Sequence, residues 1–249
     1  IKAEGLPRFV ALMTRVNALQ KLGKHDEALK TIDVAAAIPG LAPIRAAQVR
    51  DRLAAIMSLT GRNDEARAHM EAAVRIAREQ DDTLAEGRFT HNLGWVLMRM
   101  GKAQEALECH EQSLKIARAE DDIGLELMSM GSSALELNLV GRSEEAVETM
   151  QKVLLLARKH GRTALEASNL TTLCRIYHEQ GHTRDALKAA VASRDLAREI
   201  GARHTEAVAE SNIAAMRLEL GEEAGALEAM ERSYAMLTAL NDSRAALST

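Results

Sequence analysis

Six glycines divide this sequence at nearly equal intervals, and each is followed five residues later by an alanine. The glycines are Gly23, Gly61, Gly101, Gly141, Gly181 and Gly221, and the alanines are Ala28, Ala66, Ala106, Ala146, Ala186 and Ala226. The first interval is two residues shorter than the others, which are all 40 residues long. A fixed period of this size indicates structural units that stack on their neighbours. The sequence therefore predicts a repeat fold.

The composition favours helices as the repeated element. Hydrophobic residues make up 47% of the 249 residues, aromatic residues only 2%, and there are three prolines, which suits long amphipathic helices. We predict helices at about residues 7–22, 25–38, 44–60, 63–80, 83–100, 103–120, 123–140, 143–160, 163–180, 183–200, 203–220 and 223–240. They form six antiparallel pairs (7–40, 43–80, 83–120, 123–160, 163–200 and 203–240) in one all-α domain, residues 1–249. Residues 241–249 are a tail or the start of a further repeat.

The predicted boundaries carry residues suited to turns. A glycine that ends a helix adopts the left-handed backbone conformation without a steric cost. A second series of turn residues, which tolerate the same conformation, is Asp81, Asp121, Gly161, Gly201 and Asn241. The predicted N-caps are Asn63, Ser143 and Thr183, and the predicted capping boxes are Thr83 with Glu86 and Thr163 with Glu166. The pattern thus predicts where helices stop and start.

Further columns of residues predict how the helices pack. Small residues that allow close helix crossings lie at Ala54, Gly94, Ala134, Cys174 and Ala214. Two charged columns are Arg78, Arg118, Arg158 and Arg198, and Glu86, Glu126, Glu166 and Glu206. Each glutamate follows its arginine by eight residues, across a turn. The two columns either form four equivalent ion pairs or remain separately solvated.

These residues carry a family resemblance that covers essentially the whole chain. Leu93-Gly94, Leu97, Gly101, Ala106 and Leu114-x-x-Ala117-Arg118 resemble the tetratricopeptide repeat in its 40-residue bacterial form. The resemblance implies a right-handed superhelical α-solenoid, whose first helices line a concave groove for a protein or peptide. Repeats that end in Leu-Ala-Arg-Glu are similar to sensor or interaction segments of large bacterial regulators of transcription and signalling. Most of the family's aromatic residues are replaced here, and Tyr177 keeps one of them.

Charge and hydropathy exclude several classes of function. With a net charge of −4 the chain lacks the excess of basic residues that binds a polyanion, so we predict no direct binding of nucleic acid. No apolar run of 18 residues is present, so we predict no membrane span. Two isolated cysteines, Cys109 and Cys174, are consistent with a reducing cytoplasm. The chain begins at Ile1, and we expect it to be a fragment of a longer protein.

One sequence motif resembles a zinc site. His178-Glu179-Gln180-Gly181-His182 matches the H-E-x-x-H pattern, in which two histidines on one helix face bind zinc. Gly181 belongs to the periodic helix-ending glycines, so we expect His182 to lie beyond the helix that carries His178. We therefore predict no metal and no cofactor, and keep a zinc-dependent hydrolase only as an alternative.

The family's groove positions give the candidate binding residues. They are Arg52, Arg88, His91, Asn92, Trp95, Met98, Arg99, Arg175, His178 and Asn212. The amides of Asn92 and Asn212 suit an extended peptide backbone, because each offers both donors and an acceptor. Arginines 52, 88 and 99 favour an acidic ligand. Trp95 is either a ligand anchor or a packing residue.

The sequence therefore predicts a non-enzymatic scaffold. We interpret it as the sensor or interaction module of a larger bacterial regulatory protein, with a protein or peptide partner and a cytoplasmic location. A structural alternative is self-association into a homodimer through exposed solenoid ends, since Met230, Tyr234 and Leu237 on the last helix are apolar. A small-molecule ligand in the same groove is a further alternative.

Overall fold

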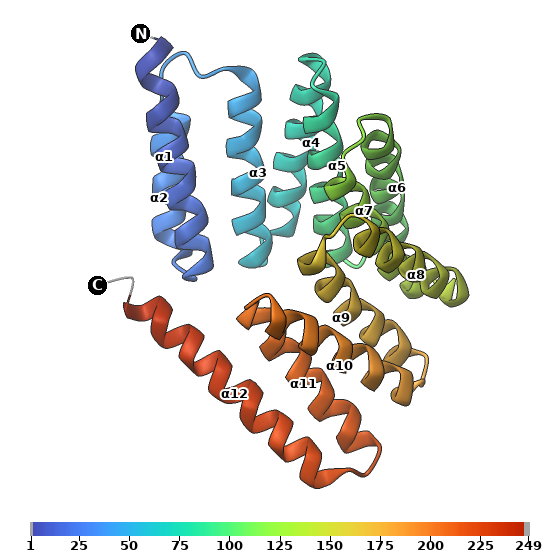
Figure 1. Cartoon of the computed structure of the whole chain (residues 1–249). Helices are drawn as coiled ribbons and strands as arrows, with labels where there is room; N and C mark the ends of the chain where they lie inside the picture. The colour runs from blue at the N-terminus through green and yellow to red at the C-terminus, as the bar shows by residue number, and fades with distance from the viewer. Residues whose placement is uncertain (1, 247–249) are drawn as a thin grey trace. The chain divides into compact units, whose positions relative to one another are not determined.

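A computed structural model describes residues 2–246, with the side chains of residues 6–20 and 22–240. Over this range the chain forms helices and no strand, as the sequence predicts (Figure 1). The helices are α1 (Lys2–Lys21), α2 (His25–Ala36), α3 (Pro43–Leu59), α4 (Asn63–Glu79), α5 (Thr83–Arg99), α6 (Ala103–Ala119), α7 (Ile123–Leu139), α8 (Ser143–Lys159), α9 (Thr163–Glu179), α10 (Thr183–Glu199), α11 (Arg203–Glu219) and α12 (Glu223–Ala246). The chain is an all-α solenoid of six helix pairs.

The turns lie where the sequence predicts them. All six periodic glycines have positive φ angles, between 72° and 83°. Asp81 and Asp121 adopt φ angles of 51° and 53° in the other series of turns, where Gly161 and Gly201 take the same conformation. Each of these turns is closed by a backbone N–H that reaches back to the preceding helix, as from Lys102 to the Leu97 carbonyl (3.0 Å).

The predicted N-caps are displaced by one residue. Asn63, Ser143 and Thr183 are the first residues of α4, α8 and α10 rather than the residues before them. The capping hydrogen bond that opens α5 comes from Asp82, whose carboxylate accepts from the Ala85 N–H at 3.0 Å. Glu86 does not close a capping box, because its carboxylate accepts from Arg78 across the turn.

Three helix ends differ from the predicted ones by two residues or more. α2 ends at Ala36 instead of residue 38, because Pro39 disfavours helical backbone at the residue before it. α1 begins at Lys2, so Pro7 lies inside the helix, where it removes one backbone hydrogen bond. α12 continues past Asn241 to Ala246. Asparagine permits a left-handed turn but does not impose one.

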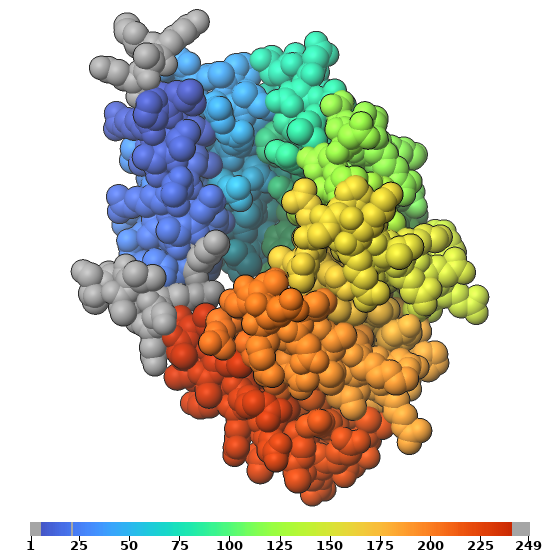
Figure 2. Space-filling view, viewed as in Figure 1, coloured from blue at the N-terminus to red at the C-terminus, as the bar shows by residue number. Residues whose placement is uncertain are grey.

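Internal contacts divide the chain into two compact units, unit 1 (residues 1–126) and unit 2 (residues 127–249). In unit 1 one apolar cluster joins α1, α2 and α3 through Phe9, Ile32 and Ile56. A second cluster joins α3, α4 and α5 around Met57 and Met70. Side chains fill the space between neighbouring helices within each unit (Figure 2).

The small-residue columns lie at the helix crossings, as predicted. All six periodic alanines are at most 4% exposed, and Ala54, Ala134, Cys174 and Ala214 are also buried. At Gly94 a Cβ atom would lie 2.5 Å from Nε2 of His110 on α6. A column of buried serines, which the sequence pattern did not predict, bonds three second helices to the helices before them. Ser113 of α6, Ser193 of α10 and Ser233 of α12 donate to the carbonyls of Gly87, Ala167 and Ala207.

The two charged columns form all four ion pairs. The distances from Nε to Oε1 are 2.7 Å for Arg78–Glu86, 2.8 Å for Arg118–Glu126, 2.5 Å for Arg158–Glu166 and 2.7 Å for Arg198–Glu206. The arginine side chains are 52–61% exposed, whereas the glutamates are 1–17% exposed. The prediction of ion pairs across each turn is confirmed, and the alternative of two solvated columns is wrong.

Candidate functional site

In unit 1 the first helices of three pairs surround a hollow of about 540 Å³. Its lining residues are Met13, Asn17, Ile44, Gln48, Asp51, Arg52, Asp82, Leu84, Ala85, Arg88, Phe89 and Asn92, which lie on α1, α3 and α5 or just before α5. Arg52, Arg88 and Asn92 are among the predicted binding residues. The structure thus brings three of the predicted residues together around one concavity.

Several polar groups of the unit-1 hollow are already bonded within the protein. The Asn92 amide donates to Oδ1 of Asp51 at 2.7 Å. Burial raises the pKa of the Asp51 carboxyl, and the Arg52 charge and the Asn92 hydrogen bond oppose that shift. The Arg88 guanidinium donates to Asp122 at 3.0 Å. We predicted that the Asn92 amide would hold a ligand backbone, but this amide already donates to the Asp51 carboxylate.

Four of the predicted residues on α5 lie outside this hollow. His91 is buried with its ring centroid 5.0 Å from that of His110, and burial lowers its pKa to about 3. His91 therefore lies in the packing between α5 and α6 and not in the wall of the hollow. Trp95 packs against the apolar cluster of α3 to α5. The Arg99 guanidinium lies 5.1 Å from the centre of the Trp95 ring and donates to the Ser58 carbonyl, and Met98 is half-buried.

In unit 2 a hollow of about 630 Å³ lies between α9 and α11, the first helices of their pairs. Its lining residues are Ser168, Thr171, Thr172, Cys174, Arg175, His178, His204, Thr205, Val208, Asn212, Ala215 and Met216. Arg175, His178 and Asn212 are among the predicted residues. The 40-residue period indicates two further lining residues, because Ser168 and Thr172 occupy the repeat positions of Arg88 and Asn92.

The polar groups of the unit-2 hollow are largely free. Arg175, His204, Thr205 and Asn212 have no side-chain hydrogen bond or ion pair with any residue that the structure describes. Three lining residues are bonded: His178, whose Nε2 lies 2.6 Å from Oε1 of Glu219, and the two threonines Thr171 and Thr172, whose hydroxyls bond Ser193 and the Ser168 carbonyl. No aspartate or glutamate is among the lining residues. The hollow therefore offers hydrogen-bond donors without a competing carboxylate in its wall.

The zinc motif does not form a metal site. α9 ends at Glu179, Gly181 has a φ angle of 76°, and His182 is the N-cap of α10. The expectation that His182 lies beyond the helix is confirmed. Burial raises the pKa of the Cys174 thiol to about 11, which disfavours the thiolate that a metal requires. Within the described residues no three His, Cys, Asp or Glu side chains are placed to hold a metal ion.

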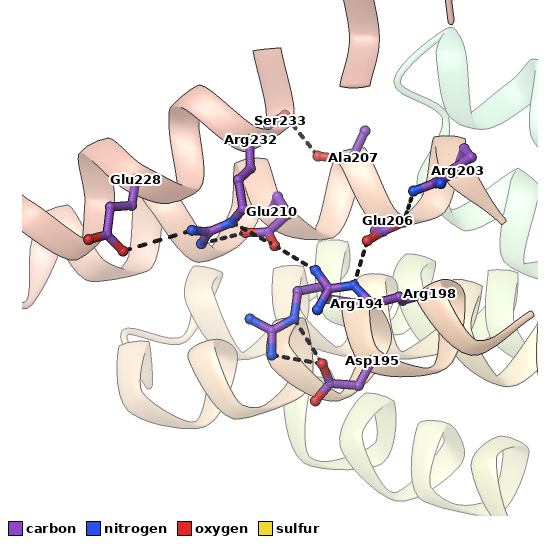
Figure 3. Close-up of polar contacts among 10 residues, drawn as sticks. All are labelled: Arg194, Asp195, Arg198, Arg203, Glu206, Ala207, Glu210, Glu228, Arg232 and Ser233. Atoms are coloured by element: carbon purple, nitrogen blue, oxygen red, sulfur yellow. Dashed lines mark hydrogen bonds and ion pairs between the residues drawn. The ribbon is translucent and has the colours of Figure 1, made fainter. Parts of the chain in front are cut away.

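Two carboxylates of α11, those of Glu206 and Glu210, bond arginine side chains, among them Arg198 of α10 and Arg232 of α12 (Figure 3). Glu206 and Glu210 are 1% and 0% exposed and line no part of the hollow. Glu210 accepts two hydrogen bonds at 3.1 Å from Arg232 of α12, and one at 3.4 Å from Arg198 of α10. This cluster fixes α11 between its two neighbours and keeps negative charge on the far side of the helix.

Comparison with known proteins gives the following matches. Residues 45–119 match the tetratricopeptide repeat family, and residues 124–180 match anaphase-promoting complex subunit 5. No curated protein sequence matches the chain significantly. None of the helices in the described range is long and apolar enough to cross a membrane.

Three solved structures illustrate the similarity of fold. A Rap protein complexed with competence and sporulation factor is 14% identical, with a TM-score of 0.79 over 95% of this chain and 65% of that one. A signal-transduction ATPase with numerous domains and a tetratricopeptide repeat sensor, from Pyrococcus horikoshii, is 15% identical, with a TM-score of 0.74 over 97% and 39%. NprR in complex with its cognate peptide NprX is 16% identical, with a TM-score of 0.68 over 90% and 66%.

Proposed function

We propose that this chain, in which residues 45–119 match the tetratricopeptide repeat family, is a non-enzymatic scaffold that binds a peptide or protein segment. The observation that carries the proposal is the position of the two hollows. Each unit has a concavity lined by the first helices of its pairs, with polar side chains around it. Two of the similar structures, the Rap protein and NprR, hold a signalling factor or peptide, which supports the same class of ligand here.

The larger context is a second part of the proposal. The chain corresponds to 39% of the ATPase from Pyrococcus horikoshii, whose repeats are described as a sensor. We propose that this chain is the sensor part of a larger regulator in the bacterial cytoplasm, in which the repeats bind the signal and another domain acts. An effector domain in the flanking sequence of the full-length gene product would support this context, and a flanking sequence without one would contradict it.

Selection from a random-sequence peptide display library on the immobilised 249-residue chain tests the binding function. We expect recovery of peptides that lose at least tenfold in affinity to Arg175→Ala with Asn212→Ala, at unchanged far-UV circular dichroism. Arg88→Ala with Asn92→Ala tests the unit-1 hollow in the same way. The matched control is Arg75→Ala with Gln151→Ala, which alters exposed residues of second helices. Peptides that bind equally to all variants would show that the hollows are not the binding site.

A second candidate function is self-association, favoured by the exposed face of α12. Leu227, Met230, Tyr234 and Leu237 follow a 3-4-3 spacing and are 39–74% exposed. In α8 the equivalent residues Met150, Leu154 and Ala157 are at most 8% exposed. Exposed Glu223 and Glu231 flank the α12 face, and a hollow on α1 and α2 is lined by two basic residues, Arg15 and Lys30, and one acidic residue, Glu27. A second copy that docks α12 against this basic end would cover the apolar residues.

Light scattering over a range of protein concentrations tests this second candidate. We expect the mass to rise with concentration, and Tyr234→Glu to abolish the rise. Leu155→Glu is the matched control, because Leu155 is 69% exposed on α8, outside the face. A constant monomer mass, or equal effects of the two substitutions, would exclude assembly through α12.

A further inference from the structure

The free donors of the unit-2 hollow indicate the charge of its ligand. Arg175 contributes a guanidinium with five N–H groups, Asn212 an amide, Thr205 a hydroxyl and His204 an imidazole. None of these groups is bonded to another described side chain. A ligand rich in acceptors would therefore gain hydrogen bonds without breaking any within the protein.

The distribution of carboxylates around α11 points in the same direction. Glu206 and Glu210 are committed to arginines on the far side of the helix. Glu219 accepts from His178 and Thr183, and these contacts lower the pKa of its carboxyl, the His178 hydrogen bond most strongly. No carboxylate therefore competes for Arg175, and a ligand carboxylate would meet a charge without an existing partner.

The remaining lining residues suit an organic acid better than a bare inorganic anion. Val208, Ala215 and Met216 place apolar surface next to the donors. The methylene groups of a glutamate side chain could lie against this surface while its carboxylate faces Arg175. A phosphate ion would leave the apolar surface without a contact.

We propose that the unit-2 hollow selects acidic peptides by binding a glutamate carboxylate between Arg175 and Asn212. This inference rests on the proposed peptide-binding function, and it assigns the acidic ligand to unit 2 rather than to unit 1. In unit 1 Asn92, the equivalent of Asn212, is already bonded to Asp51, and the nearby arginine Arg88 is bonded to Asp122. The two carboxylates in and beside that hollow would also repel an acid.

Isothermal titration calorimetry with two capped peptides, acetyl-tetraglutamate amide and acetyl-tetraglutamine amide, tests the selection. We expect the glutamate peptide to bind at least tenfold more tightly, a difference of about 1.4 kcal/mol. Arg175→Gln should remove most of that difference. Arg184→Gln is the matched control, because Arg184 is exposed in unit 2 and lines no part of the hollow. It changes the net charge equally and should leave the difference intact.

Three outcomes would overturn the inference. They are equal affinity for the two peptides, equal effects of the two arginine substitutions, and Arg175-dependent binding of inorganic phosphate without binding of the glutamate peptide. The display library separates this inference from the function on which it rests. Recovery of neutral or basic peptides alone would overturn the acidic selection and leave the scaffold function standing. Recovery of no peptide at all would overturn both.

Discussion

The two hollows lie on equivalent helices of one repeat pattern, yet their polar groups are used in opposite ways. Asn92 in unit 1 and Asn212 in unit 2 occupy the same repeat position, 120 residues apart. Asn92 donates to Asp51, and the residue that corresponds to Asp51 in unit 2 is Thr171. Thr171 bonds with Ser193 of α10, and Asn212 has no partner. The difference between Asp51 and Thr171 therefore determines whether the asparagine amide bonds within the protein or is available to a ligand.

The carboxylates show the same contrast. Unit 1 places Asp51 and Asp82 in the wall of its hollow. Unit 2 places an additional carboxylate, Glu210, between helices, where Arg198 and Arg232 neutralise it. Glu210 replaces the apolar or uncharged residues Thr90, Met130 and Leu170 of the earlier repeats. A carboxylate can thus lie on either side of a first helix in different repeats while the fold stays the same.

Arg232→Ala should have the largest effect on this contrast. It leaves the fully buried Glu210 carboxylate with only the 3.4 Å contact to Arg198. Removal of one partner from a buried ion pair costs about 3–5 kcal/mol. Native-state hydrogen exchange should show this loss in the amides of α11 and α12. Because α11 forms one wall of the unit-2 hollow, the same variant should also bind acetyl-tetraglutamate amide less tightly.

Two further variants make that prediction specific. Glu228→Ala removes an exposed carboxylate 3.8 Å from Arg232, and should cost less than about 1 kcal/mol. Arg232→Leu combined with Glu210→Leu restores an apolar residue at position 210, and should be neutral or stabilising by about 1–4 kcal/mol. If Arg232→Ala is no worse than Glu228→Ala, the buried cluster does not fix the wall of the unit-2 hollow.

The sequence predicts the fold well because the fold depends on local, periodic features. Glycine turns and ion pairs eight residues apart need only one repeat and its neighbour, so Gly101 and the Arg78–Glu86 pair could be read directly. The site depends on side-chain contacts between repeats. The bond from Asn92 to Asp51 spans 41 residues and depends on what each repeat places opposite the other. The 40-residue period does not predict His204 and Thr205, because they correspond to Leu84 and Ala85, which lie outside the predicted groove positions.

Gly94→Ala should have an intermediate effect, in the helix that forms one wall of the unit-1 hollow. The new Cβ atom would lie 2.5 Å from the His110 ring, which also contacts the His91 carbonyl at 3.2 Å. Overpacking of this kind costs about 1–3 kcal/mol, as measured by urea unfolding. In a His110→Ala background the same change should cost much less, because the obstructing ring is gone. Equal costs in both backgrounds would mean that His110 does not set the distance between α5 and α6.

Arg78→Ala should have the smallest effect, because it acts on a pair that both units repeat. The Arg78 side chain is 53% exposed, and Glu86 is 17% exposed. An exposed pair contributes roughly 0.2–1 kcal/mol to the free energy of unfolding. Arg198→Ala in unit 2 should cost more, since it leaves Glu206 and Glu210 at 1% and 0% exposure with one fewer cation. Equal losses in urea unfolding would mean that the burial of the unit-2 carboxylates has no energetic consequence, and the contrast between the two hollows would then rest on the free donors of unit 2 alone.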